Sequence, residues 1–600
     1  MASLHDLPAQ GMSLRNSSQQ SGSPRLSIVT ALASFRSALM GIGVMSGVIN
    51  VLALTGSFFM LQVYDRVIPG RSMPTLLGLA VLAGTLYTFQ GILELVRSRL
   101  LVRVGRGLDG MVSSQVYAAL MRLPLRTKLP GDGLQSLRDL DQLRSFLSGA
   151  GPTALFDLPW VPLYIGICFV FHFWIGVTAL GGAALLFGLT LLAEARTKGP
   201  TQIAGGHAAI RSSLAEATRR NAEVLQAMGF GQRVAKRWSA TNAEYLDAHT
   251  KASDVAGTLG TISKILRMVL QSGVLAIGAY LVIHQQATGG IMIASSIMMS
   301  RALAPIELAI AHWKGFVAAR QGWSRLTRLL ELLPEDRTSV VLPPPTRLLA
   351  VKGLSIAPPG VPKTVVRDAT FALAAGSGLG IIGPSASGKS SLARTLAGVW
   401  SPVSGTVRLD GATLNQWEEE ELGQHIGYLP QDVQLFDGTI AENIARFQPD
   451  APSEKILSAA RTAGVHDLIV RLPDGYETRI GEAGSALSAG QRQRIALARA
   501  LYGDPFLVVL DEPNSNLDAE GEAGLTAAIQ AIRDRNGIAI VVAHRPSALA
   551  SLDQVLAMAN GQVRAFGPKH EVLDKATRSL TNAVPLKVVP ATEGGARNVR

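Results

Sequence analysis

The chain has 600 residues, of which 48% are hydrophobic and 17% are charged, and its mean hydropathy is +0.26. This length suggests several domains, and the composition is too apolar for a protein that is soluble throughout. Basic loops of a membrane protein account for the net charge of +12, so we expect no nucleic-acid partner. The single cysteine, Cys168, excludes a disulfide within the chain.

Long uncharged stretches before residue 315 predict membrane-spanning helices. Residues 41–64 and 73–93 contain no Asp, Glu, Lys or Arg, and each is as long as the ~20-residue helix that crosses a bilayer. Residues 158–193 are uncharged over 36 positions, too long for one ordinary span, so we interpret them as two spans with a tight turn near His172. The last two of six spans are predicted at residues 268–284 and 291–313.

Positive charge in the loops sets the predicted orientation. Loops 98–151 and 196–267 are long and rich in Arg and Lys, which favours the cytoplasmic side, whereas the three other connections are short and face outward. The long cytoplasmic loops are predicted to be helical extensions of the spans, with turns at residues 131–147 and 221–229 that couple them to a cytoplasmic domain. Residues 1–26 are rich in Ser, Gln and Gly, and we expect residues 1–36 to form a disordered cytoplasmic N-terminus.

A proline-rich segment separates the apolar part of the chain from the rest. Pro343, Pro344 and Pro345 stiffen the chain beyond the last predicted helix and mark a domain boundary. The predicted divisions are 37–333 for the six-helix transmembrane domain, 334–346 for the linker, 347–575 for a second domain and 576–600 for a disordered tail.

The second domain carries a nucleotide-binding motif. Residues 383–390 read GPSASGKS between a predicted strand at 379–382 and a predicted helix that begins at Ser390. Such a Gly-rich loop presents backbone N–H groups and a helix N-terminus to phosphate oxygens, while Lys389 reaches the outer phosphates. Alone, this motif predicts only that a nucleoside triphosphate binds.

Polar residues follow the other predicted strands of this domain. The apolar run 506–510 is typical of a strand buried on both faces, and it delivers Asp511 to a magnesium ion and Glu512 toward the γ-phosphate. A second such strand, 538–543, ends at His544. Together these groups predict hydrolysis of the nucleotide.

These motifs resemble the ATP-binding-cassette (ABC) ATPase domain over roughly residues 347–575. The matching segments are GPSASGKS, Gln431 after YLP, LSAGQ at 487–491, LVVLDE at 507–512, SNLD at 515–518 and His544. The resemblance implies ATP and Mg²⁺ as cofactors. It also implies a homodimer, because each chain has one phosphate loop and one LSAGQ segment and a closed site needs both from facing chains.

The resemblance implies a role for each matching residue. Glu512 is the expected general base, Gln431 senses the metal and the attacking water, and His544 contacts the γ-phosphate. Mg²⁺ is expected at Ser390, Gln431 and Asp511. The residues expected to bind the nucleotide are Gly383, Pro384, Ser385, Ser387, Gly388, Lys389, Ser390, Ser391, Ser488, Gly490, Gln491 and Asp518, with Ser488 and Gly490 supplied by the facing chain.

The sequence departs from the family pattern at two places. Ala489 replaces the glycine that is usual at the third position of the LSAGQ segment, while Gly490 is kept. Many exporters stack adenine on an aromatic ring upstream of the phosphate loop, but no Phe, Tyr or Trp lies from Leu348 to Arg367, and Pro358 stands about where the ring would be. We therefore expect weak discrimination between ATP and GTP.

Short sequence segments elsewhere in the chain resemble the type I secretion permease/ATPases. They resemble the branch that exports RTX proteases and has no N-terminal peptidase domain. The segments are LQVYDRVI at 61–68, LRDLD at 137–141, DLPW at 157–160, RALAP at 301–305 and GYLPQD at 427–432. The resemblance covers nearly the whole chain. It implies a membrane α-helical six-span exporter domain followed by an α/β P-loop ATPase domain, in the bacterial inner membrane with the ATPase in the cytoplasm.

The same resemblance implies a substrate class and partners. No cysteine lies among the roughly 40 residues before the first span, so we expect no leader peptidase domain there. The resemblance therefore implies substrates that leave as unfolded proteins with an uncleaved C-terminal signal, like RTX proteases or lipases. The expected partners are a membrane-fusion adaptor, an outer-membrane channel, the secreted protein and membrane lipid. Arg301, a charge in or beside the last span, is a candidate for substrate contact.

Two other functions stay open from the sequence. One is a lipid or drug half-exporter of the same ABC architecture, which would work without an adaptor. The other is a membrane-tethered regulatory ATPase without transport, which intact catalytic motifs disfavour.

Overall fold

The computed structural model describes residues 28–127, 134–332, 342–543 and 546–574. Its contacts divide the chain into two compact units, and each is described by itself: Met1–Pro124 with Lys128–Glu335, and Leu125–Thr127 with Asp336–Arg600. The predicted tail at 576–600, most of the predicted N-terminal segment and much of the predicted linker lie outside the described residues.

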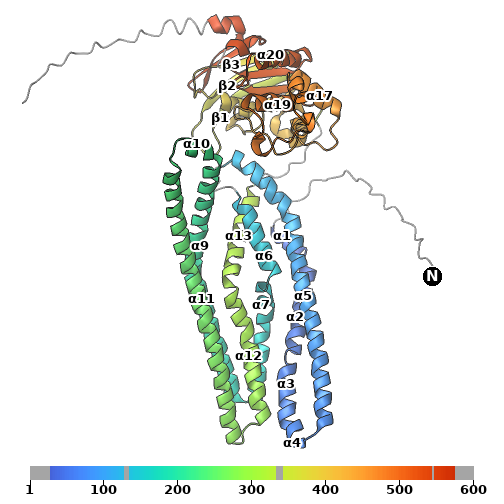
Figure 1. The fold of residues 1–600 in the computed structure, drawn as a ribbon, viewed down its shortest axis with the longest axis vertical. Helices are drawn as coiled ribbons and strands as arrows, with labels where there is room; N and C mark the ends of the chain where they lie inside the picture. The colour runs from blue at the N-terminus through green and yellow to red at the C-terminus, as the bar shows by residue number, and fades with distance from the viewer. Residues whose placement is uncertain (1–27, 128–133, 333–341, 544–545, 575–600) are drawn as a thin grey trace, which may run out of the picture. The chain divides into compact units, whose positions relative to one another are not determined.

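The first unit is entirely helical where it is described (Figure 1). Six of its helical stretches are long and apolar enough to cross a membrane, which confirms the six-span prediction. Its α-helices are α1 (Ile28–Ala33), α2 (Arg36–Leu52), α3 (Thr55–Gln62), α4 (Ile68–Gly70), α5 (Met73–Arg122), α6 (Gln135–Ser148), α7 (Gly151–Asp157), α8 (Val161–Phe171), α9 (Phe173–Arg220), α10 (Ala222–Ala227), α11 (Gly231–Ile283), α12 (Gly289–Ala311) and α13 (Trp313–Glu331).

The long uncharged stretch divides where the sequence predicted. Helix α8 ends at Phe171 and α9 begins at Phe173, with His172 between them in an extended conformation. The Nδ1 atom of His172 accepts a hydrogen bond from the backbone N–H of Trp174 at 3.2 Å, and so caps the start of α9. One residue therefore turns the chain from the third span into the fourth.

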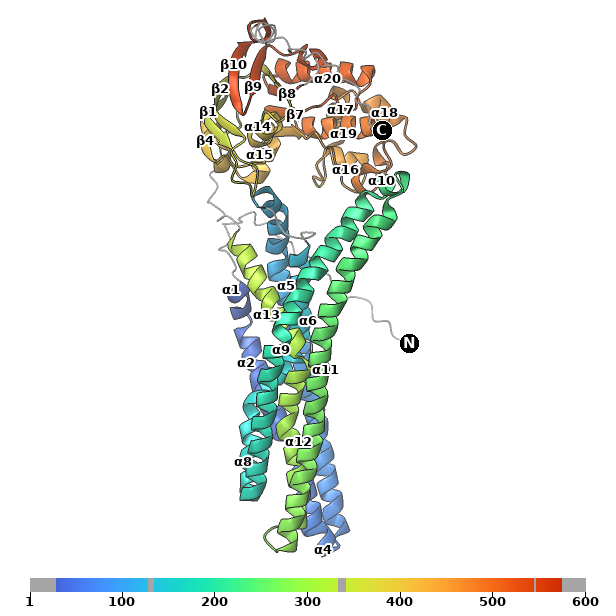
Figure 2. The same ribbon diagram turned by 90° about the vertical axis from the view of Figure 1, so that its left-hand side faces the viewer.

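Three helices continue far beyond their apolar segments. Helices α5, α9 and α11 contain 50, 48 and 53 residues. At about 1.5 Å per residue they are each more than about 70 Å long, over twice the ~30 Å hydrocarbon core. Helices α9 and α11 lie side by side in both views, with α10 at the turn between them (Figures 1 and 2).

The prediction of a turn at residues 131–147 was wrong for its described part, because residues 135–148 form helix α6. Leu140 and Leu143 of α6 are buried in one core cluster with residues of α5 and α13. Asp139 is also buried, and its two carboxylate oxygens accept hydrogen bonds from Arg325 at 2.7 Å. Apolar residues at helical spacing thus outweighed the glycines at the start of the segment.

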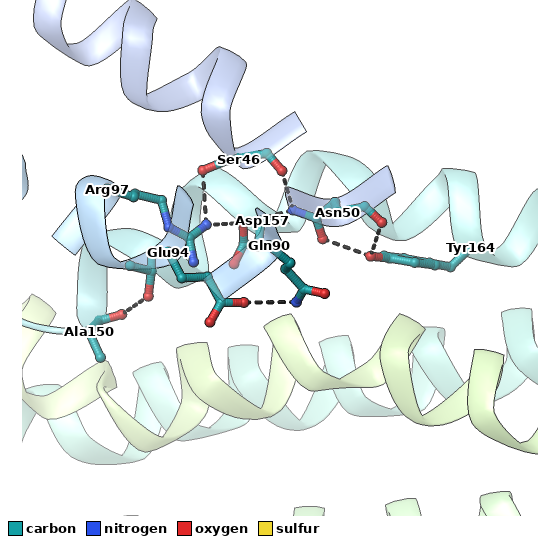
Figure 3. A network of polar contacts seen from close by, with 9 residues as sticks. Ser46, Asn50, Gln90, Glu94, Arg97, Ala150, Asp157 and Tyr164 are labelled. Carbon is teal, nitrogen blue, oxygen red and sulfur yellow. Dashed lines mark hydrogen bonds and ion pairs between the residues drawn. The ribbon is translucent and has the colours of Figure 1, made fainter. Parts of the chain in front are cut away.

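A buried polar network joins the first three spans (Figure 3). Arg97 donates to Asp157 at 2.8 Å and to the hydroxyl of Ser46 at 3.0 Å. The side-chain amide of Asn50 donates to Asp157 at 2.9 Å, and the hydroxyl of Tyr164 lies 2.9 Å from the Asn50 side-chain oxygen. These side chains come from α2, α5, α7 and α8, so they tie four helices together.

A second polar contact joins the connection after the first span to the last span. Asp65 lies in a π-helical turn, Val63–Val67. Its carboxylate accepts hydrogen bonds from the hydroxyl of Thr288 at 2.6 Å and from the backbone N–H of Gly290 at 2.8 Å. A Cβ atom at position 290 would lie 2.5 Å from this carboxylate, so the contact requires glycine there. Asp65 therefore holds the start of α12 through two hydrogen bonds.

The second unit contains two sheets (Figure 1). The antiparallel sheet has the order β2-β1-β4-β5 and the larger sheet the order β10-β9-β3-β8-β7-β6. The strands are β1 (Leu348–Ile356), β2 (Val366–Ala374), β3 (Gly378–Ile382), β4 (Ser404–Leu409), β5 (Ala412–Thr413), β6 (Ile426–Leu429), β7 (Leu507–Asp511), β8 (Ile538–Val542), β9 (Gln554–Ala559) and β10 (Gln562–Pro568).

Helices cover the larger sheet. They are α14 (Lys389–Leu396), α15 (Glu419–His425), α16 (Ile440–Ile444), α17 (Ser453–Thr462), α18 (His466–Val470), α19 (Ala489–Leu501) and α20 (Ala519–Asp534). Alternate residues of β7 pack into two different cores: Leu507 and Val509 with the antiparallel sheet and α14, and Val508 and Leu510 with α16, α19 and α20. Burial on both faces explains why the sequence of this strand is continuously apolar.

Candidate active site

Four adjacent strands of the larger sheet end at the same edge. Strands β3, β8, β7 and β6 are parallel neighbours. The GPSASGKS loop follows β3, Asp511 and Glu512 lie at the end of β7, and Gln431 follows β6. Ligands of open α/β sheets bind outside the carboxyl ends of such strands. His544, which follows β8, lies outside the described residues.

The conformation of the Gly-rich loop depends on two of its glycines. Gly383 has a φ of 150°, and a Cβ atom there would lie 2.2 Å from the backbone oxygen of Met558. Gly388 has a φ of 96°, which favours glycine, and a Cβ atom there would lie 2.8 Å from Val366. Helix α14 begins at the next residue, so the loop opens onto a helix N-terminus, where phosphate groups bind well.

Lys389 lies against the loop that precedes it. Its ammonium group donates to the backbone oxygens of Gly383 at 2.8 Å and Pro384 at 2.9 Å, and the residue is only 5% exposed. Burial lowers the pKa of Lys389, while the nearby carboxylates of Glu512 and Asp511 act to raise it. A buried ammonium beside this loop is suited to contact phosphate oxygens.

Ser390 and Asp511 form the part of the site that fits a cation. The hydroxyl of Ser390 donates to Asp511 Oδ1 at 3.1 Å, and Asp511 is fully buried. Its Oδ2 atom has no hydrogen-bond partner among the described residues, and burial raises the pKa of this carboxyl. One carboxylate and one hydroxyl, completed by phosphate oxygens and water, match the ligands that Mg²⁺ prefers.

Glu512 is held beside Gln431. The side-chain amide of Gln431 donates to Glu512 Oε2 at 3.1 Å. Glu512 has a φ of 51°, which is uncommon for a residue with a side chain, and its backbone N–H donates to Val542 of the neighbouring strand β8 at 3.1 Å. The chain turns sharply directly after β7, so that Asp511 and Glu512 lie at the edge where the strands end.

The LSAGQ segment forms a helix start. The Ser488 hydroxyl accepts from the backbone N–H of Gln491 at 3.2 Å, while the Gln491 side chain accepts from the backbone N–H of Ser488 at 2.8 Å. This capping box begins α19. Within the described part of the chain, no hydrogen bond joins Ser488, Gly490 or Gln491 to the GPSASGKS loop. A Cβ atom at Gly490 would lie 2.9 Å from the backbone oxygen of Asn516, which is a reason within the chain for this glycine.

Gln493 was not predicted from the sequence, although it organises the segment after Glu512. It is 3% exposed, donates to the backbone oxygens of Glu512 at 3.3 Å and of Pro513, and accepts from Asn516 N–H at 3.1 Å. A polar residue in an otherwise apolar helix face is the only signal for it in the sequence.

Asp518, expected at the nucleotide, is bonded within its own chain. It caps α20 by accepting from the backbone N–H of Gly521 at 2.9 Å, and it also pairs with Arg494. These two bonds, the first more than the second, lower the pKa of its carboxyl. Ser385 and Ser391 lie on the phosphate loop and α14 respectively, and Ser387 is buried with its hydroxyl unbonded among the described residues.

Comparison with known proteins agrees with this architecture. Residues 39–304 match the model of the ABC transporter transmembrane region, and residues 366–515 match that of the ABC transporter. The chain is 56% identical over 548 residues to the type I secretion system ATP-binding protein PrsD of Rhizobium meliloti, which covers 91% of this chain and 94% of PrsD. The chain belongs to the type I secretion ATP-binding proteins.

Further relatives support this membership. The cyclolysin secretion/processing ATP-binding protein CyaB of Bordetella pertussis is 28% identical over 91% of this chain and 77% of CyaB. The leukotoxin translocation ATP-binding protein LktB of Mannheimia haemolytica is 27% identical over 91% of the chain and 78% of LktB. A solved bacterial Atm1-family ABC exporter shares the fold, with a TM-score of 0.79 and 23% identity over 92% of this chain and 100% of that one.

As a type I secretion ATP-binding protein, the chain is an ATPase coupled to transmembrane transport, and its role is in protein export. Its ATPase domain binds ATP. Its six apolar helices make it a multi-pass protein of the inner membrane, with the ATPase on the cytoplasmic side.

Proposed function

We propose that this chain hydrolyses ATP to export unfolded proteins that carry an uncleaved C-terminal signal of the RTX protease or lipase kind. The observation that supports this most is the Ser390–Asp511 and Gln431–Glu512 contacts at the strand ends of a chain that resembles PrsD over 91% of its length. The sequence segments shared with RTX protease exporters support the substrate class.

Each site residue has a proposed task in hydrolysis. The loop from Gly383 to Ser391 binds the phosphates through its N–H groups, and the Lys389 ammonium neutralises the outer phosphates. Glu512 accepts the proton of the attacking water, and Gln431 holds the Glu512 carboxylate in position through its 3.1 Å hydrogen bond. His544 is proposed to contact the γ-phosphate.

Mg²⁺ is proposed to be held by Ser390 and Asp511, with Gln431 nearby. When bound, it neutralises negative charge on the phosphates as the bond breaks. The buried, unbonded Oδ2 atom of Asp511 supports this assignment.

The working form is proposed to be a homodimer with two composite sites. Each would combine the loop of one chain with Ser488 and Gly490 of the facing chain. This has a direct test. A Lys389→Ala chain and a Ser488→Arg chain would each be inactive alone, but an equal mixture would recover activity through heterodimers with one intact site. If the mixture were as inactive as each variant alone, the proposal of sites shared between two chains would be contradicted.

The proposed partners are a membrane-fusion adaptor and an outer-membrane channel. The names of PrsD, CyaB and LktB place those proteins in secretion or toxin translocation, which supports a secreted protein as cargo here. The short connections between spans leave little chain outside the membrane to form a conduit without such partners.

Secretion of a reporter tests the substrate class. A reporter joined to the C-terminal segment of a secreted Ca²⁺-binding-repeat protein would appear in the medium of cells that contain this chain, an adaptor and a channel. It would stay inside cells with the Lys389→Ala variant. Export of lipids or drugs in place of the reporter, independent of the adaptor, would instead identify a half-exporter of small amphiphiles.

A further inference from the structure

We propose that a groove on helix α2 binds one acyl chain of an anionic phospholipid, with Arg36 pairing with the lipid headgroup. The groove is about 730 Å³ in volume. It is lined by residues of α2 between Met40 and Leu52 and by Trp160, all of which are apolar. This surface lies within the first membrane span, so the hydrocarbon core of the bilayer is its surrounding medium.

The groove follows one stripe along helix α2. Figure 2 shows the position of this helix in the first unit. Met40, Val44, Gly47 and Val51 recur every three or four residues and so lie on one face. Met40, Val44 and Val51 are 57%, 69% and 51% exposed, whereas the opposite face, which includes Ile42, packs against α5. The stripe is therefore unpartnered among the described residues and presents side chains outward.

Small residues make the stripe concave. Gly47 contacts the Trp160 ring so closely that a Cβ atom would lie 2.6 Å from Trp160 Cζ2, and the ring forms one wall of the groove. A Cβ atom at Gly43 would meet nothing within 4 Å, so this position is an open notch. A flexible acyl chain can lie along such an open, apolar groove, whose lining residues offer no charged group to hold a headgroup along its length.

The length of the groove corresponds to one leaflet. From Met40 to Val51 the helix rises about 17 Å, at about 1.5 Å per residue. Half of the ~30 Å hydrocarbon core is about 15 Å. An acyl chain of one leaflet could therefore lie along the whole groove.

Charge selects the headgroup and the leaflet. Arg36 lies on the same stripe as Met40, one turn before it, is exposed, and has no carboxylate partner in the described ranges. The first span begins on the cytoplasmic side, because six spans return the chain to the side of the ATPase. A basic residue near the cytoplasmic surface attracts anionic lipids by about 1 kcal/mol, or roughly fivefold in occupancy.

Photolabelling in proteoliposomes tests the proposal. The probes are phosphatidylglycerol and phosphatidylcholine that carry the same diazirine in one acyl chain, each as a minor component of phosphatidylcholine vesicles. We expect labelled peptides to map to residues 36–52, with roughly fivefold more label from phosphatidylglycerol. Gly43→Leu places its Cβ atom in open space and fills the notch, so it would reduce this label severalfold. Arg36→Gln would leave the label but remove the preference for phosphatidylglycerol.

Matched controls separate this site from general lipid contact. Gly78→Leu adds the same side chain at an exposed glycine of α5 that also has nothing within 4 Å, and Arg103→Gln removes an exposed arginine of α5 outside the groove. Neither would change the labelling of residues 36–52. Label spread evenly over all spans, label unaffected by Gly43→Leu, or protection of residues 36–52 by a second copy of the chain in cross-linking would each overturn the proposal.

Discussion

Asp511 shows how burial prepares a single residue for a cation. Its carboxylate is fully buried, one of its oxygens is unbonded among the described residues, and burial raises its pKa above the ordinary value of about 3.9. A nearby cation would offset the cost of keeping this charge away from water. A bound metal ion would therefore lower the free-energy cost of keeping the buried Asp511 carboxylate ionised.

The raised pKa predicts a pH-dependent requirement for Mg²⁺. Only the ionised carboxylate binds the cation, and a raised pKa means that protonation competes at a higher pH than for an ordinary Asp. As the pH falls, the Mg²⁺ concentration for half-maximal ATPase activity should therefore rise, and the rise should begin above the usual Asp range. Titration of ATPase activity with Mg²⁺ at several pH values measures this.

Asp511→Asn provides the comparison for that titration. We expect it to raise the Mg²⁺ requirement at least tenfold, since it removes a charge that contributes about 1.4 kcal/mol or more to Mg²⁺ binding. We also expect it to abolish the rise of the Mg²⁺ requirement at low pH. Asp467→Asn, at an exposed position on α18, should change neither. A Mg²⁺ requirement that is unchanged by Asp511→Asn would contradict the proposed metal site.

At the residue scale, sequence indicates site residues that follow strands but misses those that support them. Lys389, Ser390 and Asp511 could be predicted because phosphate-binding loops and buried strands have recognisable sequences. Gln493 could not, because it lies on a helix and its partners are backbone oxygens 19 and 20 residues away. These groups come together only because the fold buries α19 and β7 in one core.

At the scale of elements, buried polar contacts hold the spans together. The Arg97–Asp157 pair is largely buried, with 10% and 17% of the two side chains exposed. Removal of one partner of such a pair leaves a buried charge without a counter-charge, which costs about 3–5 kcal/mol. Asp157→Ala should therefore lower the thermal unfolding temperature of the purified protein clearly, whereas Asp157→Asn, which keeps an acceptor, should lower it less.

The exposed pair Asp141–Arg144 serves as a control. Exposed pairs contribute about 0–1 kcal/mol, so Asp141→Ala should leave the unfolding temperature nearly unchanged. Equal effects of Asp141→Ala and Asp157→Ala would show that the network in Figure 3 does not stabilise the fold.

The contact between Asp65 and the start of α12 predicts that two substitutions, at Asp65 and at Gly290, have non-additive effects on the free energy of unfolding. Gly290→Ala would place a Cβ atom 2.5 Å from the Asp65 carboxylate, which could move away only by losing its bonds to Thr288 and the helix start. We expect a destabilisation of about 1–3 kcal/mol. In an Asp65→Ala background the same substitution should cost much less, and a double-mutant cycle of unfolding measures the difference. Additive effects would contradict the contact.

Element existence was easier to predict than element pairing. Uncharged runs predicted six spans and their division at His172, because both depend on local composition. Helix α6 was missed because its burial depends on α5 and α13, which lie elsewhere in the chain. The partners that tie Asp65, Asp139 and Asp157 to other helices lie 60 to 225 residues away, so no local pattern identifies them.

For the whole molecule, the order of the two parts follows from composition and motifs. An apolar half with basic loops precedes a half in which strands β3, β6 and β7 bring the phosphate loop, Gln431 and Asp511–Glu512 to the same edge of a sheet. Because the chain belongs to the type I secretion ATP-binding proteins, its transmembrane half and its ATPase half form one ATP-driven exporter. The central claim is therefore that hydrolysis at Glu512 serves a protein cargo.

The most direct measurement is the ATPase activity of the purified protein in lipid, with and without the C-terminal segment of a candidate secreted protein. We predict that Glu512→Gln lowers turnover by about 10²–10⁴-fold with ATP binding retained, since it removes the proposed general base, while Glu454→Gln on the surface of α17 has no effect. The segment, but not a scrambled version, should change the wild-type rate. Full activity of the Glu512→Gln variant, or a response only to lipids or drugs, would contradict the account.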